Sequence, residues 1–265
     1  MSGPLPISLC VITRDAATQL RDCLASVPFA AEIVVVDSGS VDDTVEIARG
    51  CGARVIARDW PGFGAQKNFA VGQAKHDWVL CLDADERLTP ELAGAIDGAA
   101  PDMTRAGAPA AYAMARRNRF FGRWLAHGEG YPDWNVRLFD RRRARWSEDP
   151  VHEHVLADGP VTRLAGDLLH DSAESLDRYM TKQNRYTTLQ AEAMHARGER
   201  AGTLRLVVSP LARFLRFYVV RLGCLDGAAG FVHIAIGCFN SFMKYAKLRA
   251  LQCEAEIARD AGQRR

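Results

Sequence analysis

Four apolar segments alternate with helix-like segments through the first hundred residues, and this alternation limits the fold more than any other feature of the chain. The apolar segments cover residues 7–13, 32–37, 53–57 and 77–83, and the helical patterns cover 16–26, 41–49, 66–74 and a stretch that begins near Pro90. The apolar segments are nearly continuous and rich in β-branched residues, as in parallel strands that helices cover on both faces. The sequence therefore predicts an α/β fold with a doubly wound sheet.

Composition excludes several other classes of protein. The chain has 265 residues, of which 48% are hydrophobic and 25% charged, so we expect neither disorder nor a coiled coil. The net charge of +2 does not indicate a nucleic-acid binder. Seven cysteines without a CxxC pair indicate free thiols in a reducing compartment. The first residues lack the basic region of a signal peptide, so we expect a cytoplasmic protein.

Polar residues stand where the predicted strands end, which is where open α/β sheets bind ligands. They include Thr13, Asp15, Asp37, Asp83 and Asp85. Side chains two apart on an extended segment share a face, so Asp83 and Asp85 can point into one site and bind Mg or Mn together with substrate phosphates. The alternative is a polar strand exit that caps the next helix. No GxGxxG follows the first strand and no P-loop motif occurs, so a dinucleotide fold and a P-loop enzyme are poorly supported.

Several motifs together resemble a known family. They are ISLCVITRD (7–15), EIVVVDSGSVDDT (32–44), GFGAQKN (62–68) and WVLCLDADE (78–86). In this order and spacing they resemble the family 2 inverting glycosyltransferases of GT-A fold. The later PDWNVRLF (132–139), VHEH (151–154) and FYVVRLGCLDGAAGF (217–231) resemble the branch that contains lipopolysaccharide core β-1,4-glucosyltransferases.

The resemblance implies a fold and a division of the chain. The fold is a Rossmann-like mixed sheet flanked by helices, with a C-terminal helical, membrane-associating extension. We expect the catalytic domain at residues 1–172, with a nucleotide-sugar half at 1–100 and an acceptor half at 101–172, and the extension at 173–265.

The resemblance also implies the donor site. Thr13, Asp15 and Asp37 would hold the nucleoside, although Asp37 has an alternative role as a helix N-cap. Lys67 and Asn68 would lie near the donor's base or phosphates, where Lys67 could instead be solvated. Asp83 would approach the ribose and a divalent cation, either Mg or Mn. Asp85 would be the principal metal ligand. His170 would reach the same metal or the diphosphate from the C-terminal side, with ordinary packing as the alternative for that histidine.

Inverting transfer needs a base that removes the proton of the acceptor hydroxyl. The candidates are Glu148, Asp149 and Glu153, of which we choose Glu153 first and Asp149 second. A structural ion pair with Arg142 or Arg143 is the alternative for Glu153. The HEH triplet at 152–154 is not an HExxH motif, so zinc is not expected.

The acceptor side is basic and aromatic. Residues 116–146 contain nine arginines and three acids among seven aromatic side chains. Guanidinium groups bind phosphates and aromatic faces stack on sugars, so a phosphorylated oligosaccharide fits this composition, with Arg137, Trp134 and His152 as candidate acceptor-binding residues. Single-stranded RNA would fit it too, as would a solvated arginine face.

The segment 205–249 combines apolar stretches with seven Lys or Arg and a single acid, Asp226. No uncharged run in it reaches the roughly 20 residues that span a bilayer. We therefore expect helices that lie on the inner face of the cytoplasmic membrane, with packing on the α/β domain or a homodimer contact as the alternatives.

These observations lead to one main hypothesis. The chain is expected to be a metal-dependent hexosyltransferase that moves glucose from UDP-glucose to an inner-core heptose of lipopolysaccharide, with no nucleic-acid partner. The alternatives are transfer to another lipid-linked or capsule acceptor, a metal-dependent nucleotidyltransferase, and an RNA-binding module.

Overall fold

The computed structural model describes residues 3–105, 107–149, 153–172 and 175–263, with side chains up to residue 257. Internal contacts divide the chain into two compact units. The first comprises Met1–Arg119 and Pro132–Ser172, and the second comprises Phe120–Tyr131 and Ala173–Arg265.

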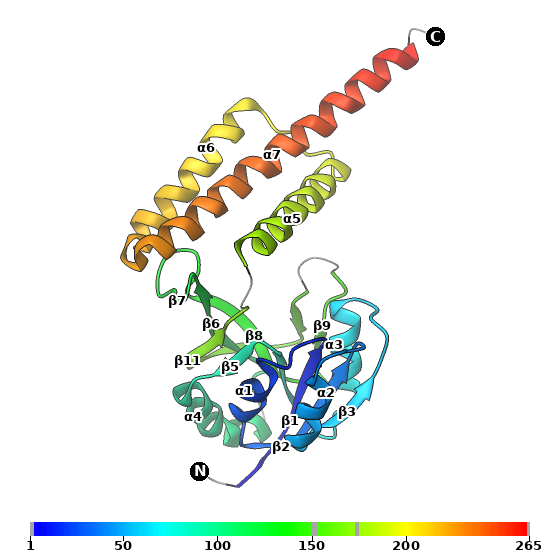
Figure 1. Ribbon diagram of the computed structural model, residues 1–265, viewed down its shortest axis with the longest axis vertical. Helices are drawn as coiled ribbons and strands as arrows, with labels where there is room; N and C mark the ends of the chain where they lie inside the picture. The colour runs from blue at the N-terminus through cyan, green and yellow to red at the C-terminus, as the bar shows by residue number, and fades with distance from the viewer. Residues whose placement is uncertain (1–2, 106, 150–152, 173–174, 264–265) are drawn as a thin grey trace. The chain divides into compact units, whose positions relative to one another are not determined.

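The first unit is built on a central sheet with helices beside it (Figure 1). The strands of this unit are β1 (Leu5–Thr13), β2 (Ala30–Asp37), β3 (Arg54–Ala57), β4 (Trp78–Asp83), β5 (Glu86–Leu88), β6 (Ala111–Phe120), β8 (Asp133–Asp140), β9 (Ala144–Trp146), β10 (Val155–Ala157) and β11 (Val161–His170). Strands β9 and β10 form a separate two-stranded sheet. Its helices are α1 (Leu20–Ala25), α2 (Thr44–Gly50), α3 (Phe63–Gly72), α4 (Pro90–Ala99) and the short 3-10 helix η1 (Ala100–Thr104).

The strand order brings the polar strand ends together. The order along the sheet is β3-β2-β1-β4-β8-β6-β11-β5. Strand β1 is parallel to both β2 and β4, with Thr13 opposite Asp37 and Ile12 opposite Asp83. Strand β8 is antiparallel to both β4 and β6, so the sheet is mixed. The predicted mixed α/β fold is confirmed.

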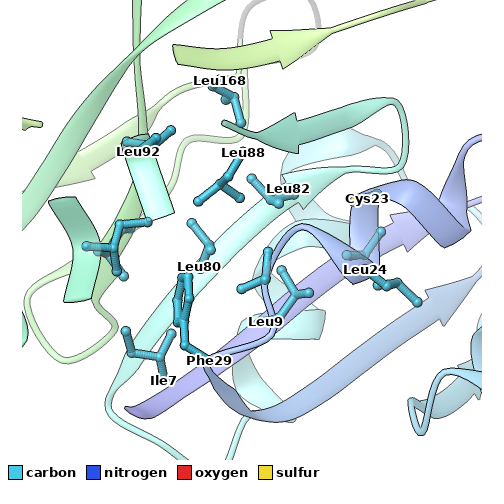
Figure 2. Close-up of a cluster of buried hydrophobic side chains, with 14 of the residues drawn as sticks. Ile7, Leu9, Cys23, Leu24, Phe29, Leu80, Leu82, Leu88, Leu92 and Leu168 are labelled. Carbon is cyan, nitrogen blue, oxygen red and sulfur yellow. The ribbon is translucent and has the colours of Figure 1, made fainter. Parts of the chain in front are cut away.

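Two hydrophobic clusters cover the two faces of this sheet. Successive strand residues point to opposite faces, so Leu9 joins one cluster and Cys10 the other. The larger cluster packs α1, α2 and α4 against β1 and β4, and Figure 2 shows Leu9, Leu80 and Leu82 at its centre. The smaller cluster packs α3 and Trp146 of β9 on the other face. Burial of each fully buried aliphatic side chain contributes roughly 1.5–3 kcal/mol to the free energy of folding. The packed strands therefore hold the polar residues at their ends in fixed positions.

The first two helices begin later than the sequence pattern predicted. Helix α1 begins at Leu20 rather than Ala16, and α2 at Thr44 rather than Val41. Carboxylates hold the loops before them, since Asp42 accepts the amide of Ala17 and Asp37 accepts the amides of residues 39 and 40. Backbone N–H groups bound in this way have less to gain from an extra helical turn.

The second unit is helical apart from a two-residue strand. It contains β7 (Arg123–Trp124), α5 (Leu176–Ala196), α6 (Thr203–Phe214), the π-helical η2 (Leu215–Val220), the 3-10 helix η3 (Gly223–Asp226) and α7 (Gly227–Gln263). Helix α7 packs against both α5 and α6. Within the described residues no single helix is long and apolar enough to cross a bilayer, although one pair bent by 75°, residues 203–220 and 223–257, passes on length and composition together.

Candidate active site

A buried lysine joins two of the predicted site residues. The Nζ atom of Lys67, on α3, lies 2.8 Å from Oδ1 of Asp83 and 3.0 Å from Oε1 of Glu153. It also lies 4.4 Å from the ring centroid of Trp146, a distance at which a cation is attracted to the ring. Lys67 is only 4% exposed, so it is not the solvated lysine of the alternative interpretation.

A second buried cation lies on the other side of Asp83. Arg137, on β8, donates to Oδ2 of Asp83 at 3.0 Å and to both carboxylate oxygens of Glu86 at 2.7 and 2.8 Å. Partial burial opposes ionisation of Asp83, but the charges of Lys67 and Arg137 outweigh it and hold the pKa of this carboxyl well below its usual range. Asp83 is therefore a carboxylate at any physiological pH.

Asp85 faces His170, the last residue of β11. The Nε2 atom of His170 lies 3.2 Å from Oδ2 of Asp85. The Nδ1 atom of His170 lies 2.8 Å from the side-chain oxygen of Asn118, which orients the ring. The backbone adds to this arrangement, because the amide of Asp171 donates to the carbonyl of Asp85.

The chain turns at residues 84–85 instead of continuing as the extended segment assumed from the sequence. Asp83 therefore ends β4 between two cations, whereas Asp85 lies in the turn beside His170. A carboxylate oxygen and an imidazole nitrogen that face each other suit a divalent cation that keeps water and phosphate ligands as well. The described residues contain no group of three or more His, Cys, Asp or Glu side chains placed to hold a metal, so this pair would need substrate oxygens to complete a coordination shell.

The predicted nucleoside residues meet at the ends of β1 and β2. The carboxylate of Asp37 accepts the amides of Gly39 and Ser40 at 2.9 Å and the hydroxyl of Ser40. Asp15, with a φ of +50°, accepts the amide of Val41 at 2.8 Å. Both carboxylates thus hold the β2–α2 loop, and their contact with a nucleoside stays a prediction. The helix-capping alternative for Asp37 is not what the structure shows, because α2 begins at Thr44.

Two polar side-chain atoms, one at the end of β1 and one on α3, have no partner among the described residues. The hydroxyl of Thr13 and the side-chain oxygen of Gln66 are buried and have no hydrogen-bond partner among the described residues. The Gln66 nitrogen donates to the hydroxyl of Ser38 at 3.0 Å and so ties α3 to the end of β2. Unpaired buried polar groups are costly and often mark a place that a ligand completes.

Asn68 has a structural task in the first unit. Its side-chain oxygen accepts the backbone amide of Trp146 at 2.9 Å, and its nitrogen donates to the Trp146 carbonyl at 3.0 Å. This pair of bonds fixes α3 to β9 and thereby places Lys67 under the Trp146 ring. The role of Asn68 in donor binding stays a prediction.

The first and second choices among the three candidate bases have different surroundings. Glu153 is 19% exposed and its ion-pair partner is Lys67, whereas Arg142 pairs with Asp77 and Asp140. Asp149 is 60% exposed and lies 3.7 Å from Nδ1 of His154. Only Glu153 is joined through one lysine to the aspartate that ends β4, so the geometry favours it over Asp149 as the base.

The structure describes two of the three predicted acceptor residues. Arg137 is buried between Asp83 and Glu86, as described above. Trp134 is 39% exposed on β8, with the guanidinium of Arg163 located 4.5 Å from its ring centroid. His152 lies outside the described residues. The acceptor roles of these three residues stay predictions.

Two side chains of this site were missed by reasoning from the sequence. Glu86 is fully buried and receives Arg137, and Asn118 orients His170. Glu86 directly follows the DAD triplet, so an acid next to a hydrophobic strand was the available signal for it. Asn118 carries no signal of its own, because its proximity to His170 arises from the pairing of β6 with β11.

Comparison with known proteins supplies an independent line of evidence. Residues 8–152 match the family model described as glycosyl transferase family 2. A lipopolysaccharide core biosynthesis glycosyltransferase of Rhizobium meliloti, LpsC, is 31% identical over 94% of this chain and 93% of its own length. An uncharacterized glycosyltransferase of Rickettsia prowazekii is 29% identical over 94% of this chain and 89% of its own length.

Similarity to solved structures is more limited. Glucosyl-3-phosphoglycerate synthase from Mycobacterium tuberculosis, solved with Mn2+ and UDP, aligns with a TM-score of 0.36 and 23% identity over 43% of this chain and 44% of that chain. Agreement at this level carries no argument about ligands or reaction.

Proposed function

Because the chain belongs to glycosyl transferase family 2 and is a glycosyltransferase, we propose that it transfers glucose from UDP-glucose, with inversion, to an inner-core heptose of lipopolysaccharide at the inner face of the cytoplasmic membrane. The similarity to LpsC along nearly the whole of both chains supports the acceptor class. The observation that carries the proposal is the meeting of Asp83, Lys67 and Glu153 at the end of β4, next to the turn that holds Asp85, whose carboxylate faces His170.

The donor end of the site is assigned to the strand ends. Asp37, Asp15 and Thr13, at the ends of β1 and β2, would meet the nucleoside, with the buried Thr13 hydroxyl as one unsatisfied group. Asp85 and His170 would hold the divalent cation, and Asp83 would lie next to it. A bound Mg or Mn ion would neutralise charge on the departing UDP.

Glu153 is assigned the proton transfer. Its carboxylate would accept the proton of the acceptor hydroxyl while that oxygen forms a bond to the anomeric carbon and the bond from that carbon to the UDP oxygen breaks. Lys67 would orient the Glu153 carboxylate through the 3.0 Å contact. Arg137 would hold Asp83 in place from the opposite side.

Titration calorimetry with UDP-glucose, UDP-galactose, GDP-mannose and ATP, each with and without Mn, tests the donor assignment. We expect metal-dependent binding of UDP-glucose that is lost in Asp85→Ala. Asp77→Ala is the matched control, because Asp77 is an exposed carboxylate just before the opposite end of the same strand. Binding of ATP without binding of any nucleotide sugar would replace this proposal by a nucleotidyltransferase.

Glucose transfer from radiolabelled UDP-glucose to purified heptose-terminated core lipid then tests the acceptor. The same donor offered to capsule precursors or polyprenyl-linked sugars is the comparison. Transfer to one of these alone would contradict the acceptor class and leave the donor assignment intact.

A further inference from the structure

A stripe of exposed apolar side chains runs along α6 and into η2. The α6 stripe consists of Leu204, Val207, Val208, Leu211, Leu215, Val219 and Val220. Its first five members fall within about a third of the helix circumference at 3.6 residues per turn. Leu211 is 58% exposed and Val220 is 76% exposed, although both lie in ordered helical segments.

The opposite side of α6 is the one that the second unit covers. Ser209 lies 2.7 Å from the hydroxyl of Ser241 on α7, and Arg213 forms an ion pair with Glu129. Helix α6 therefore makes these contacts on one side and leaves the apolar stripe exposed on the other. An amphipathic helix that contributes to a protein core is oriented the other way.

The charge around the α6 stripe has one sign. Residues 201–253 include seven Lys or Arg and one acid, Asp226. Asp226 is 2% exposed and accepts the backbone amides of Ala126 and His127, so it does not offset the exposed cations. Arg205, on α6, and Arg216, on η2, are both exposed.

The apolar surface continues around the bend that follows η2. Leu222, which adopts a left-handed backbone with φ of +56°, and Leu225 are both exposed there. The 75° bend between residues 203–220 and 223–257 separates this surface from the axis of α7. An apolar surface formed by one short helix and the following bend suits a helix that lies in the plane of a membrane interface rather than one that crosses the bilayer.

We propose that the α6 stripe, with Leu222 and Leu225, inserts into the interfacial layer of an anionic phospholipid membrane while Arg205 and Arg216 contact lipid phosphates. Basic amphipathic helices bind such surfaces by burying apolar side chains to the depth of the headgroups, with arginine stems extending to the charged layer. This inference does not depend on the proposed reaction.

Charge favours lipid over a second copy of the chain as the partner. A two-fold contact along the α6 stripe would bring the same basic flanks of both copies together. No exposed acid in residues 201–253 is available to pair them. Lipid phosphates supply the missing negative charge.

Flotation of the full chain with vesicles tests the proposal. The probes are vesicles of phosphatidylethanolamine with about a third phosphatidylglycerol, and vesicles of phosphatidylcholine alone. We expect the protein to float with the anionic vesicles, to be released by high salt or alkaline carbonate, and to bind neutral vesicles at least about tenfold more weakly.

Two variants locate the surface. Val208→Gln/Leu211→Gln should lower the partition coefficient at least roughly tenfold, because two inserted apolar side chains are lost. Arg205→Gln/Arg216→Gln should lower binding to anionic vesicles and leave neutral vesicles unaffected. Ile257→Gln, at an exposed position of α7 outside the surface, is the matched control, and far-ultraviolet circular dichroism checks the fold of each variant.

Three results would overturn the proposal. The first is failure of the wild-type protein to float, or equal flotation of wild type and Val208→Gln/Leu211→Gln. The second is resistance to carbonate extraction, which would indicate a bent span through the bilayer. The third is a dimer in light scattering that Val208→Gln/Leu211→Gln dissociates without any effect on lipid binding. Loss of UDP-glucose binding in Asp85→Ala has no bearing on these outcomes.

Discussion

Lys67 bridges Glu153 and Asp83, two acids that lie 70 residues apart in the sequence and are both contacted by one ammonium group at 3.0 and 2.8 Å. The ammonium group of Lys67 also lies against the Trp146 ring, and the backbone of Trp146 is bound by Asn68. The candidate base and the acid at the end of β4 therefore share one positive charge. A substitution at any of the three residues should therefore change the electrostatic surroundings of the other two.

Replacement of Glu153 by Gln removes the proposed base and keeps the shape of the side chain. We expect kcat to fall by roughly 10²- to 10⁴-fold while the affinity for UDP-glucose stays within about threefold, because general-base assistance acts only in the transition state. Steady-state transfer kinetics and donor calorimetry measure the two quantities. Glu91→Gln, at an exposed position of α4, is the control, and a loss of kcat in Asp149→Asn or Glu148→Gln alone would transfer the role to that residue.

The ion pairs of Asp83 predict a change of stability in acid. The pKa of Asp83 is lower in the folded protein than its value of about 3.9 in an unfolded chain, so the unfolded state binds the proton more readily. The stabilisation is complete above about pH 5 and is lost progressively as the pH falls below about 4. Lys67→Met should be less stable at pH 7 and should lose less stability between pH 5 and 2.

Urea unfolding at a series of pH values measures this effect. Lys75→Met, at an exposed position of the same unit, should keep the wild-type profile. Asp83→Asn provides a second approach, since it should reduce the same acid-side slope without removing the lysine. An unchanged slope in both site variants would show that the ion pairs do not lower the pKa of Asp83.

Removal of Arg137 should destabilise the first unit more than the loss of a surface arginine. The Glu86 side chain is 0% exposed, and Arg137→Met would leave its charge without its main partner. We expect a loss of about 3–5 kcal/mol in the free energy of unfolding, of which Arg137→Met/Glu86→Leu should recover a large part. Arg105→Met, which breaks an exposed pair with Asp102, should cost less than about 1 kcal/mol.

Chemical denaturation at pH 7 distinguishes these cases. Equal losses of unfolding free energy in Arg137→Met and Arg105→Met would mean that other groups compensate the buried charge of Glu86. If Arg137→Met folds with normal stability and loses only acceptor binding, Arg137 is an acceptor-binding residue, as the sequence suggested.

His233 predicts a second pH effect, in the helical unit. Burial, with Arg213 nearby, lowers the pKa of this histidine to about 4, and its ring packs against the rings of Phe120 and Tyr179. Protonation is therefore easier in the unfolded chain, whose histidine has a pKa of about 6.5. Stability should be full above about pH 6.5 and should decrease by up to about 3 kcal/mol as the pH falls toward 4.

The variant His233→Leu should flatten this part of the profile. Thermal unfolding between pH 4 and 7 measures it, and His76→Leu, in the other unit, is the comparison. A parallel fall of stability in wild type and His233→Leu would assign the pH dependence to other groups.

Much of the first unit could be predicted from its sequence, because its signals are local. The continuous apolar runs of β1, β2 and β4 depend on burial within each segment, and the predicted strands agree with the structure. The acids at the ends of these strands follow from the same pattern. The resemblance to family 2 glycosyltransferases is confirmed, and so is the class of enzyme.

The partners of the site residues could not be predicted in the same way. Arg137 reaches Glu86 only because β8 inserts antiparallel between β4 and β6, and no local pattern specifies that order. The turn at 84–85 separates Asp83 from Asp85, although the DAD spacing indicates a shared face in an extended chain. The outward orientation of the α6 stripe likewise depends on which side of the helix α7 covers.

Asp226 joins the C-terminal helices to a segment of the same unit located 100 positions earlier in the chain. Its carboxylate receives the amides of Ala126 and His127 at 2.9–3.1 Å, and these amides belong to the short insertion that interrupts the first unit. The C-terminal helices are therefore not a cassette that recombination could attach to any related transferase. A chimera that exchanged residues 173–265 alone would separate the Asp226 carboxylate from the amides that bind it. The insertion at 120–131 and the C-terminal helices should therefore be inherited, and exchanged, together.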